Sequence, residues 1–243
     1  LLCQQSTQPL PPPPRVIYRR DYSSSKRPTT FLVGIFIVMA DVQRRRLIRE
    51  TMLGREMPEQ DRLCSLQQYL SSSATTSKCQ VVYTFVVGGN PQAPTEWSED
   101  SGLPQTMDAS QMLKHEQDII YLNIKENMND GKTTSWFDYA TTLDVDYVAK
   151  ADSDSLISIP QLLSYINGHL PPVAQHPKLY GGYLNEYQAC GGGGAICDKL
   201  RGKVYMSGQF YWLSRDLAVY LSQINVHQAR RNFIKIDNED SDL

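Results

Sequence analysis

The chain has 243 residues, of which 41% are hydrophobic and 21% charged, values ordinary for a folded domain with a substantial core. Its 24 basic and 26 acidic residues give a formal net charge of −2. This balance argues against a nucleic-acid-binding protein, because such proteins usually carry a basic excess. The longest strongly apolar run, residues 31–40, is too short to span a bilayer.

The first 30 residues are predicted to form a stem or linker. Pro9 and Pro11–Pro14 precede a basic, serine-rich segment, and consecutive prolines favour an extended chain that forms no core. The chain begins at Leu1 rather than Met and stops abruptly after Leu243. We therefore expect a piece of a longer protein, with any membrane anchor lying upstream.

From residue 31 onward, strand patterns alternate with helix patterns. Strands are predicted at 31–38, 81–87, 118–122, 146–151 and 178–183, and helices at 41–53, 58–70, 132–143 and 160–168. The strand at 31–38 is a continuous apolar run, which is typical of a strand buried on both faces. The alternation predicts one α/β domain over 31–243, with a mainly parallel, Rossmann-type sheet flanked by helices.

Two aspartates directly follow the strand predicted at 146–151. Ligands of open α/β sheets bind beyond the carboxyl ends of the strands, where Asp152 and Asp154 lie. Because Mg²⁺ and Mn²⁺ commonly bridge one or two carboxylates to substrate phosphates, the pair is a candidate metal site. The alternative is a pair that caps the next helix. Asp144 and Asp146 share the spacing but lie at the start of that strand, which favours capping or solvation of a turn.

Asp240 lies in an acidic stretch, residues 237–240. The ordinary interpretation of such a stretch is a solvated loop. The functional interpretation is a general base, since an aspartate within hydrogen-bonding reach can take a proton from a hydroxyl.

The cysteines show no zinc-binding spacing among the five present. Two interpretations stay open. The thiols are isolated and buried, or one or two disulfides form in an oxidising compartment, with Cys190–Cys197 as one candidate pair.

The order of several short blocks carries more information than any single block. The blocks are Arg45–Met52, Glu116–Ile120, Asn123–Thr133, Tyr147–Ile157, Tyr180–Tyr183, Tyr205–Asp216 and Glu239–Asp240. Together they resemble the β-1,3-galactosyltransferase / β-1,3-N-acetylglucosaminyltransferase family, with the Fringe proteins as distant relatives. In three places the chain departs from the family pattern: Met52 replaces a tryptophan, the block Glu116–Ile120 lacks a tyrosine, and Ser153 replaces the middle residue of an aspartate triplet.

The resemblance implies a GT-A fold and an inverting hexosyltransferase. The enzyme would move galactose or an N-acetylhexosamine from a UDP-sugar to a glycan hydroxyl, in β-1,3 linkage, on a glycoprotein or glycolipid. Asp154 would ligate Mn²⁺, with Mg²⁺ as the alternative ion, and Asp152 would lie near the ribose and the metal. Asp240 would deprotonate the acceptor.

Five further residues are candidates for substrate contacts under this resemblance. Arg45 and Arg49 are candidates for the nucleotide pocket, and the alternative is a solvated helix face. Lys150 is a candidate for the diphosphate, although its place on a strand also fits the core. Tyr211 and Trp212 would line a sugar site or pack in the core.

The resemblance also implies a Golgi lumenal domain of a type II membrane protein. The family supplies a histidine metal ligand downstream of Glu239–Asp240, and the chain ends before it. We therefore expect the catalytic domain to be incomplete at its C-terminus. The alternatives are a catalytically silent homologue that binds UDP or carbohydrate, a GT-A transferase of different linkage or donor, and a nucleotide-binding α/β domain with unrelated chemistry.

Overall fold

The computed structural model describes residues 28–54, 60–72, 78–89, 116–124, 126, 131–170, 178–186 and 204–223. Its strands are β1 (Phe31–Phe36), β2 (Leu63–Ser65), β3 (Val81–Gly88), β4 (Ile119–Leu122), β5 (Tyr147–Asp152), β6 (Tyr180–Glu186) and β7 (Val204–Ser214). Its helices are α1 (Val42–Ile48), α2 (Leu66–Ser71), α4 (Lys132–Thr141), α5 (Ile159–Gly168) and α7 (Arg215–Gln223), with the π-helical turn η1 (Arg49–Leu53) and the 3₁₀ turn η2 (Gln60–Arg62). No helix in these segments is long and apolar enough to cross a membrane.

All the described strands belong to one sheet, in the order β2-β3-β1-β5-β7-β6, with β4 pairing to β3. β1 lies parallel to β3 and β5, and both β2 and β4 lie parallel to β3. β7 runs antiparallel to β5, and β6 runs antiparallel to β7. The predicted mainly parallel sheet is confirmed, and an antiparallel pair of strands extends it at one side.

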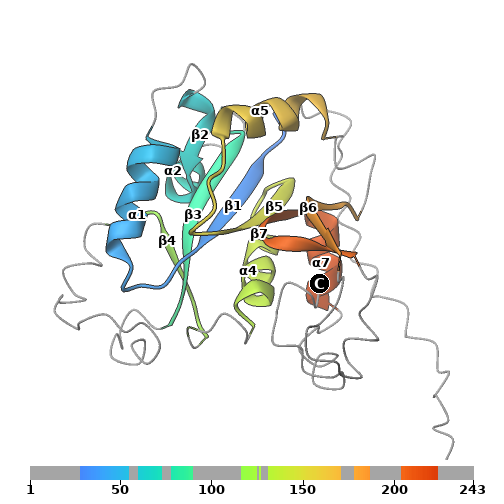
Figure 1. The fold of residues 1–243 in the computed structure, drawn as a ribbon. Coiled ribbons are helices and arrows are strands. Elements are labelled where there is room, and N and C mark those ends of the chain that lie inside the picture. The colour runs from blue at the N-terminus through green and yellow to red at the C-terminus, as the bar shows by residue number, and fades with distance from the viewer. Residues whose placement is uncertain are drawn as a thin grey trace, which may run out of the picture.

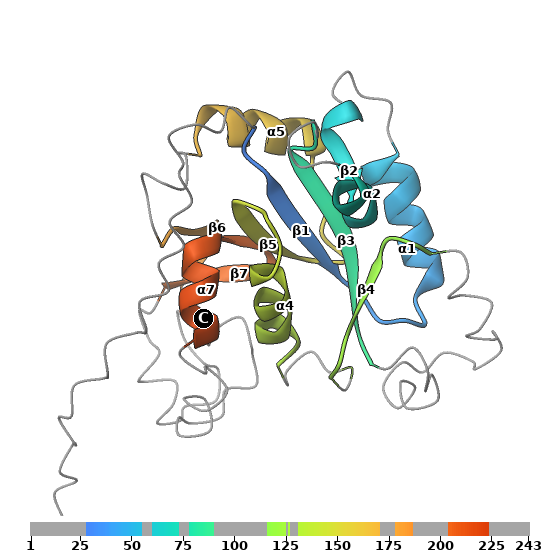
Figure 2. The ribbon, with the colours of Figure 1, turned by 180° about the vertical axis from the view of Figure 1, so that it is seen from behind.

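Helices cover both faces of the sheet, as Figures 1 and 2 show from opposite sides. Side chains of α1, η1 and α5 pack on one face, against alternate strand residues such as Val33 and Ile35 of β1. Side chains of α2, α4 and α7 pack on the other face, against residues such as Leu32 of β1 and Val148 of β5. Successive strand residues point to opposite faces, so the continuous apolar strands supply both cores.

The structure differs from the predicted elements at two places. The helix expected at 58–70 is wrong in its first half, because Leu63–Ser65 pairs with β3 as the short strand β2. Ser65 then begins α2 with a capping box: its hydroxyl accepts from the backbone N–H of Gln68, whose side chain accepts from the backbone N–H of Ser65. The second difference is that β7 and α7 have no counterpart among the predicted elements.

A disulfide joins Cys64 of β2 to Cys79, which lies two residues before the start of β3. The two Cα atoms are 5.7 Å apart, and the residues are 15 apart in sequence. The bond ties the short strand β2 to β3, so the interpretation as isolated thiols is wrong for this pair. The pair considered from the sequence, Cys190 and Cys197, lies outside the described residues.

Removing this disulfide in the double variant Cys64→Ala/Cys79→Ala is expected to lower the free energy of unfolding by about 3 kcal/mol. A crosslink across a loop of this length removes roughly that much chain entropy from the unfolded state. Urea denaturation measures the change, and the wild-type protein treated with a reductant should lose a similar amount. A double variant as stable as the oxidised wild type would contradict the prediction.

Gly34 of β1 lies directly beneath the indole ring of Trp136. A Cβ atom at this position would overlap the ring. Trp136, on α4, is fully buried, and its Nε1 donates a hydrogen bond to the carbonyl oxygen of Ala149 at 3.1 Å. The close approach of α4 to the sheet therefore depends on a residue without a side chain.

Gly34→Ala is expected to destabilise the fold by about 1–3 kcal/mol, because the indole would have to move inside a packed core. Gly168→Ala is the matched control, since its added Cβ would meet no atom within 4 Å, and we expect its stability to stay near that of the wild type. Urea denaturation of both variants gives the comparison. Equal losses from the two substitutions would count against this role of Gly34.

Candidate functional site

The two aspartates predicted to bind a metal lie at the carboxyl edge of the sheet. Asp152 is the last residue of β5 and pairs with Phe36, the last residue of β1. The backbone N–H of Ser153 donates to the carbonyl oxygen of Phe36 at 3.1 Å. The backbone N–H of Ser155 donates to the backbone carbonyl oxygen of Asp152 at 3.0 Å, which closes a turn. Asp154 is exposed on this turn. The turn thus holds both carboxylates where ligands of α/β sheets bind.

The alternative role of this pair as helix caps is wrong. The next helix, α5, has Ser158 as its N-cap residue, and no side chain caps it by a hydrogen bond. In contrast, Oδ2 of Asp146 accepts a hydrogen bond from the backbone N–H of Thr30, 116 residues away in sequence, at 2.8 Å. The aspartates 152 and 154 are therefore not explained by local capping.

The oxygen atoms of this turn suit a hard divalent cation. Asp152 keeps 28% of its side chain exposed, and Asp154 is exposed. The buried hydroxyl of Ser155, on the same turn, has no hydrogen-bond partner in the described structure. Among the described residues, no group of three or more acidic, histidine or cysteine side chains is arranged so that it could hold a metal ion. Two carboxylates that share a cation with substrate phosphates are the arrangement in which Mg²⁺ is commonly held.

Lys150 precedes Asp152 by two residues on β5 and shares its face of the sheet. Its Nζ lies 3.1 Å from Oδ1 of Asp152 and donates to the carbonyl oxygen of Gly208 on β7 at 3.2 Å. Only 7% of the side chain is exposed. The ammonium group is thus held beside the candidate metal ligand rather than in solvent.

A second buried lysine lies at the same edge, and sequence reasoning did not single it out. Lys132, the first residue of α4, forms an ion pair with Glu126 at 2.7 Å and donates to the carbonyl oxygen of Ile37 at 3.1 Å. The other carboxylate oxygen of Glu126 accepts from the backbone N–H of Gly88 at 2.7 Å. This pair connects the carboxyl ends of β1 and β3 to the start of α4. The only sequence signal was that both residues fall inside the block Asn123–Thr133.

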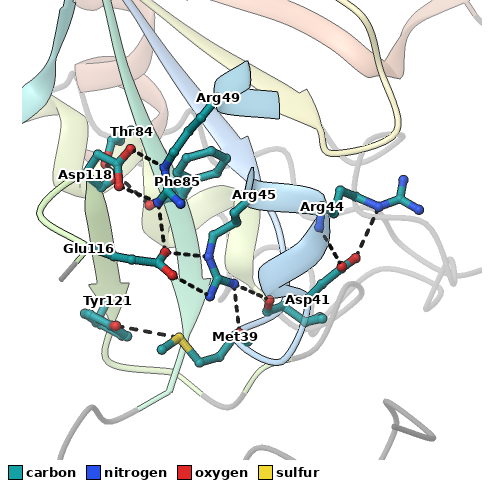
Figure 3. Close-up of polar contacts among 11 residues, drawn as sticks. Met39, Asp41, Arg44, Arg45, Arg49, Thr84, Phe85, Glu116, Asp118 and Tyr121 are labelled. Carbon is teal, nitrogen blue, oxygen red and sulfur yellow. Dashed lines mark hydrogen bonds and ion pairs between the residues drawn. The ribbon is translucent and has the colours of Figure 1, made fainter. Parts of the chain in front are cut away.

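Arg45 is completely buried on α1, so the interpretation as a solvated helix face is wrong for it. Its guanidinium donates to both carboxylate oxygens of Glu116, at 2.7 and 3.3 Å. It also donates to the carbonyl oxygens of Val38 and Met39, at 3.1 and 2.8 Å (Figure 3). Arg45 therefore holds the segment that follows β1 in place through hydrogen bonds to its carbonyl oxygens.

Arg49 extends the same cluster and is 29% exposed. Its guanidinium donates to both oxygens of Asp118, at 2.9 and 2.7 Å, and to Glu116 at 2.8 Å, and lies over the ring of Phe85 (Figure 3). Burial opposes the charge of Arg49, but the hydrogen bonds to Asp118 and Glu116 outweigh it and raise the pKa of the guanidinium. Burial likewise opposes ionisation of Glu116, but the hydrogen bonds from Arg45 and Arg49 hold its carboxyl pKa below the usual range.

A polar cavity of about 530 Å³ lies next to this cluster. It is lined by Arg49, Ser65, Gln67, Gln68, Ser71, Tyr83, Glu116, Gln117 and Asp118. It lies where β2 and β4 follow one another along β3, since Ser65 pairs with Tyr83 and Ile119 with Phe85. Asp152 and Asp154 do not line it, so the cavity and the carboxyl edge are different places.

Comparison with known proteins identifies the family of this chain. A family model described as Galactosyltransferase matches residues 43–241. The chain belongs to the galactosyltransferase family. The predicted assignment to a β-1,3-galactosyltransferase-type family of glycosyltransferases is thereby confirmed.

No curated protein gave a significant match to this galactosyltransferase-family chain. Among solved structures, the chain is similar to the apo-form glycosyltransferase GlyE of Streptococcus pneumoniae TIGR4, with 11% sequence identity and a TM-score of 0.37. The match covers 86% of the present chain and 41% of GlyE. The chain therefore spans less than half the length of that protein.

Two aromatic residues considered for a sugar site are part of the core of this galactosyltransferase-family domain. Tyr211 is fully buried and lies against Phe137, with ring centroids 5.9 Å apart. Trp212 is 7% exposed and meets Tyr147 edge to face at 5.3 Å. Their core-packing interpretation is confirmed. Asp240, the candidate base, lies outside the described residues.

Proposed function

We propose that this chain is the catalytic domain of an inverting, manganese-dependent hexosyltransferase. It transfers galactose or an N-acetylhexosamine from a UDP-sugar to a glycan hydroxyl on a glycoprotein or glycolipid, in β-1,3 linkage. One observation carries the proposal: in a chain of the galactosyltransferase family, Asp152 and Asp154 lie at the carboxyl end of β5. The resemblance of the short blocks supports the linkage and the inversion.

Asp154 and Asp152 are the residues that would hold the cation, because Asp154 is exposed and the side chain of Asp152 is partly exposed on the same turn. When bound, Mn²⁺ would neutralise the negative charge that develops on the UDP leaving group. Mg²⁺ is the alternative, since both ions prefer oxygen ligands. Arg49, which is partly exposed, remains a candidate for direct nucleotide contact, whereas Arg45 would act by ordering the segment after β1.

Asp240 would take the proton from the acceptor hydroxyl as the hydroxyl oxygen attacks the anomeric carbon of the donor. Attack from the face opposite the departing UDP inverts the configuration in one displacement. Such a reaction needs a base and a leaving-group site, but no nucleophile from the protein. The sequence agrees with this requirement, since it contains no Gly-x-Ser-x-Gly elbow and no reactive-cysteine signature.

We place the domain in the Golgi lumen, on a type II membrane protein. The Cys64–Cys79 disulfide supports an oxidising compartment, where such bonds persist. The proline-rich first 30 residues agree with a stem between the domain and an anchor. A fluorescent fusion of the full-length protein that stays in the cytosol would contradict this placement.

A UDP-release assay on the full-length protein tests the proposed activity. UDP-galactose, UDP-N-acetylglucosamine and UDP-N-acetylgalactosamine are offered with simple sugar acceptors, in Mn²⁺ or in EDTA. We expect acceptor-stimulated release from one donor that disappears in EDTA, and a β-linked product by NMR. If UDP binds but no donor is turned over, either the acceptor panel lacks the right acceptor or the chain is a silent homologue. If UDP does not bind, the proposal fails.

A further inference from the structure

Two buried lysines lie against the same aromatic ring at the carboxyl edge. The Nζ atoms of Lys132 and Lys150 are each 5.4 Å from the ring centroid of Phe36. Their side chains are 3% and 7% exposed. A lysine removed from water must keep its hydrogen bonds and a counter-charge, because an unpaired buried ammonium is costly. The exposure of the carboxylate that pairs with each lysine therefore distinguishes the roles of the two lysines.

The partner of Lys132 is closed off from ligands. Glu126 is 8% exposed, and its second oxygen accepts from the backbone N–H of Gly88. Lys132 itself donates to the carbonyl oxygen of Ile37. These contacts join the pair to the ends of β1 and β3 and to the start of α4, so the pair stabilises the edge of the sheet.

The partner of Lys150 faces outward instead. Asp152 keeps 28% of its side chain exposed, on the turn that also carries Asp154. The ammonium of Lys150 is fixed from three other sides, by the carbonyl oxygen of Gly208 at 3.2 Å and by the rings of Phe36 and Tyr211, whose centroids are 5.4 and 5.7 Å away. A cation fixed in this way holds Oδ1 of Asp152 at one point, 3.1 Å from Nζ.

We propose that Lys150 is a positioning residue, which holds the carboxylate of Asp152 in the orientation that receives a divalent cation and does not itself contact the diphosphate. This inference rests on the proposed function, since it assumes that Asp152 and Asp154 bind Mn²⁺ together with UDP. It revises the role expected for Lys150 from the sequence, because a side chain 7% exposed and bound to Gly208 is turned toward β7. Groups that orient metal ligands typically contribute about 10–100-fold to metal affinity.

The test compares Lys150→Met with Lys132→Met in the full-length protein. The two lysines share their burial, their aromatic neighbour and a backbone carbonyl partner, and differ in the carboxylate that they hold. Mn²⁺ binding is measured by electron paramagnetic resonance at saturating UDP, UDP binding without metal by calorimetry, and folding by thermal melting.

We expect both variants to melt at lower temperature than the wild type. Only Lys150→Met should weaken Mn²⁺ binding, by about 10–100-fold, with metal-free UDP binding unchanged. Lys150→Arg keeps the charge if the methionine variant does not fold. Its larger guanidinium cannot occupy the position of the ammonium between the two rings, so Mn²⁺ binding should weaken by several-fold.

Three results would overturn the inference. Wild-type Mn²⁺ affinity in Lys150→Met, or in Lys150→Arg where only that variant folds, makes Lys150 a structural cation. An equal loss of Mn²⁺ affinity in Lys132→Met shows that any loosening of the edge is sufficient. Weaker metal-free UDP binding in Lys150→Met shows direct contact with the diphosphate. If the wild-type protein itself binds no Mn²⁺ with UDP, the proposed function fails, and the inference fails with it.

Discussion

Asp240→Asn is expected to lower the turnover number of the enzyme by about 10²–10⁴-fold, the range that a positioned general base contributes. Asparagine has nearly the shape of aspartate but cannot accept the proton of the acceptor hydroxyl. Because the substitution leaves Asp152 and Asp154 in place, the affinities for UDP and Mn²⁺ should stay at wild-type values. Steady-state kinetics with the active donor, together with UDP calorimetry, separates the two effects.

Asp242→Asn is the matched control for this prediction. Asp242 lies two residues after Asp240, so the two variants remove the same charge from neighbouring positions. A variant at Asp242 with the same loss of turnover would mean that the charge of the stretch matters, rather than one base. Asp154→Ala should have the opposite pattern of effects. It should abolish Mn²⁺ binding, whereas Asp240→Asn should leave Mn²⁺ binding unchanged and lower only the turnover number.

The fold was largely predictable because its strands are apolar on both faces. A strand such as Phe31–Phe36 stands out from any surface segment, and its burial follows from composition alone. β2 escaped prediction because a strand of three residues is shorter than any periodic pattern. β7 escaped prediction because most of its N-terminal residues, which extend beyond β5, are at least partly exposed. No continuous apolar run therefore marks all of its 11 residues.

The site was predictable in part, for a related reason. Asp152 and Asp154 were found because the end of a buried strand can be located in the sequence. The burial of Arg45 was not predictable, since a periodic pattern counts arginine as polar, whereas the apolar Leu47 of the same helix is 57% exposed. The contact that buries Arg45 comes from Glu116, 71 residues away. Pairing over such a distance, like the choice of Cys64 with Cys79, is decided by topology that local patterns do not contain.

Glu116→Gln is expected to destabilise the protein by about 3–5 kcal/mol at neutral pH, because it leaves the buried guanidinium of Arg45 without its counter-charge. The side chain of Arg45 is 0% exposed and that of Glu116 is 13% exposed, so water cannot replace the lost partner. The ion pair of Arg49 with Asp118 remains after the substitution, but it does not supply Arg45 with a counter-charge. Urea denaturation at pH 7 measures the loss.

Glu50→Gln is the matched control, since Glu50 pairs with Arg46 on the exposed surface of the same helical segment, with side chains 59% and 73% exposed. Exposed pairs of this kind contribute little to stability, so we expect its denaturation midpoint to stay near that of the wild type. Equal effects of the two substitutions would show that burial does not strengthen the pairing of Arg45 with Glu116.

The pH dependence of stability gives an independent measure of the same pair. Burial tends to raise the pKa of Glu116, but the hydrogen bonds from Arg45 and Arg49 outweigh it and lower that pKa. A carboxyl with a lowered folded-state pKa stabilises the protein above its unfolded pKa of about 4.3 and loses this contribution as pH falls through the folded value. The stability difference between wild type and Glu116→Gln should therefore be full at pH 7 and shrink in acid below the unfolded pKa. A difference that stays constant down to that acid range would mean that the glutamine disrupts packing, and that the lost charge of Glu116 is not the cause.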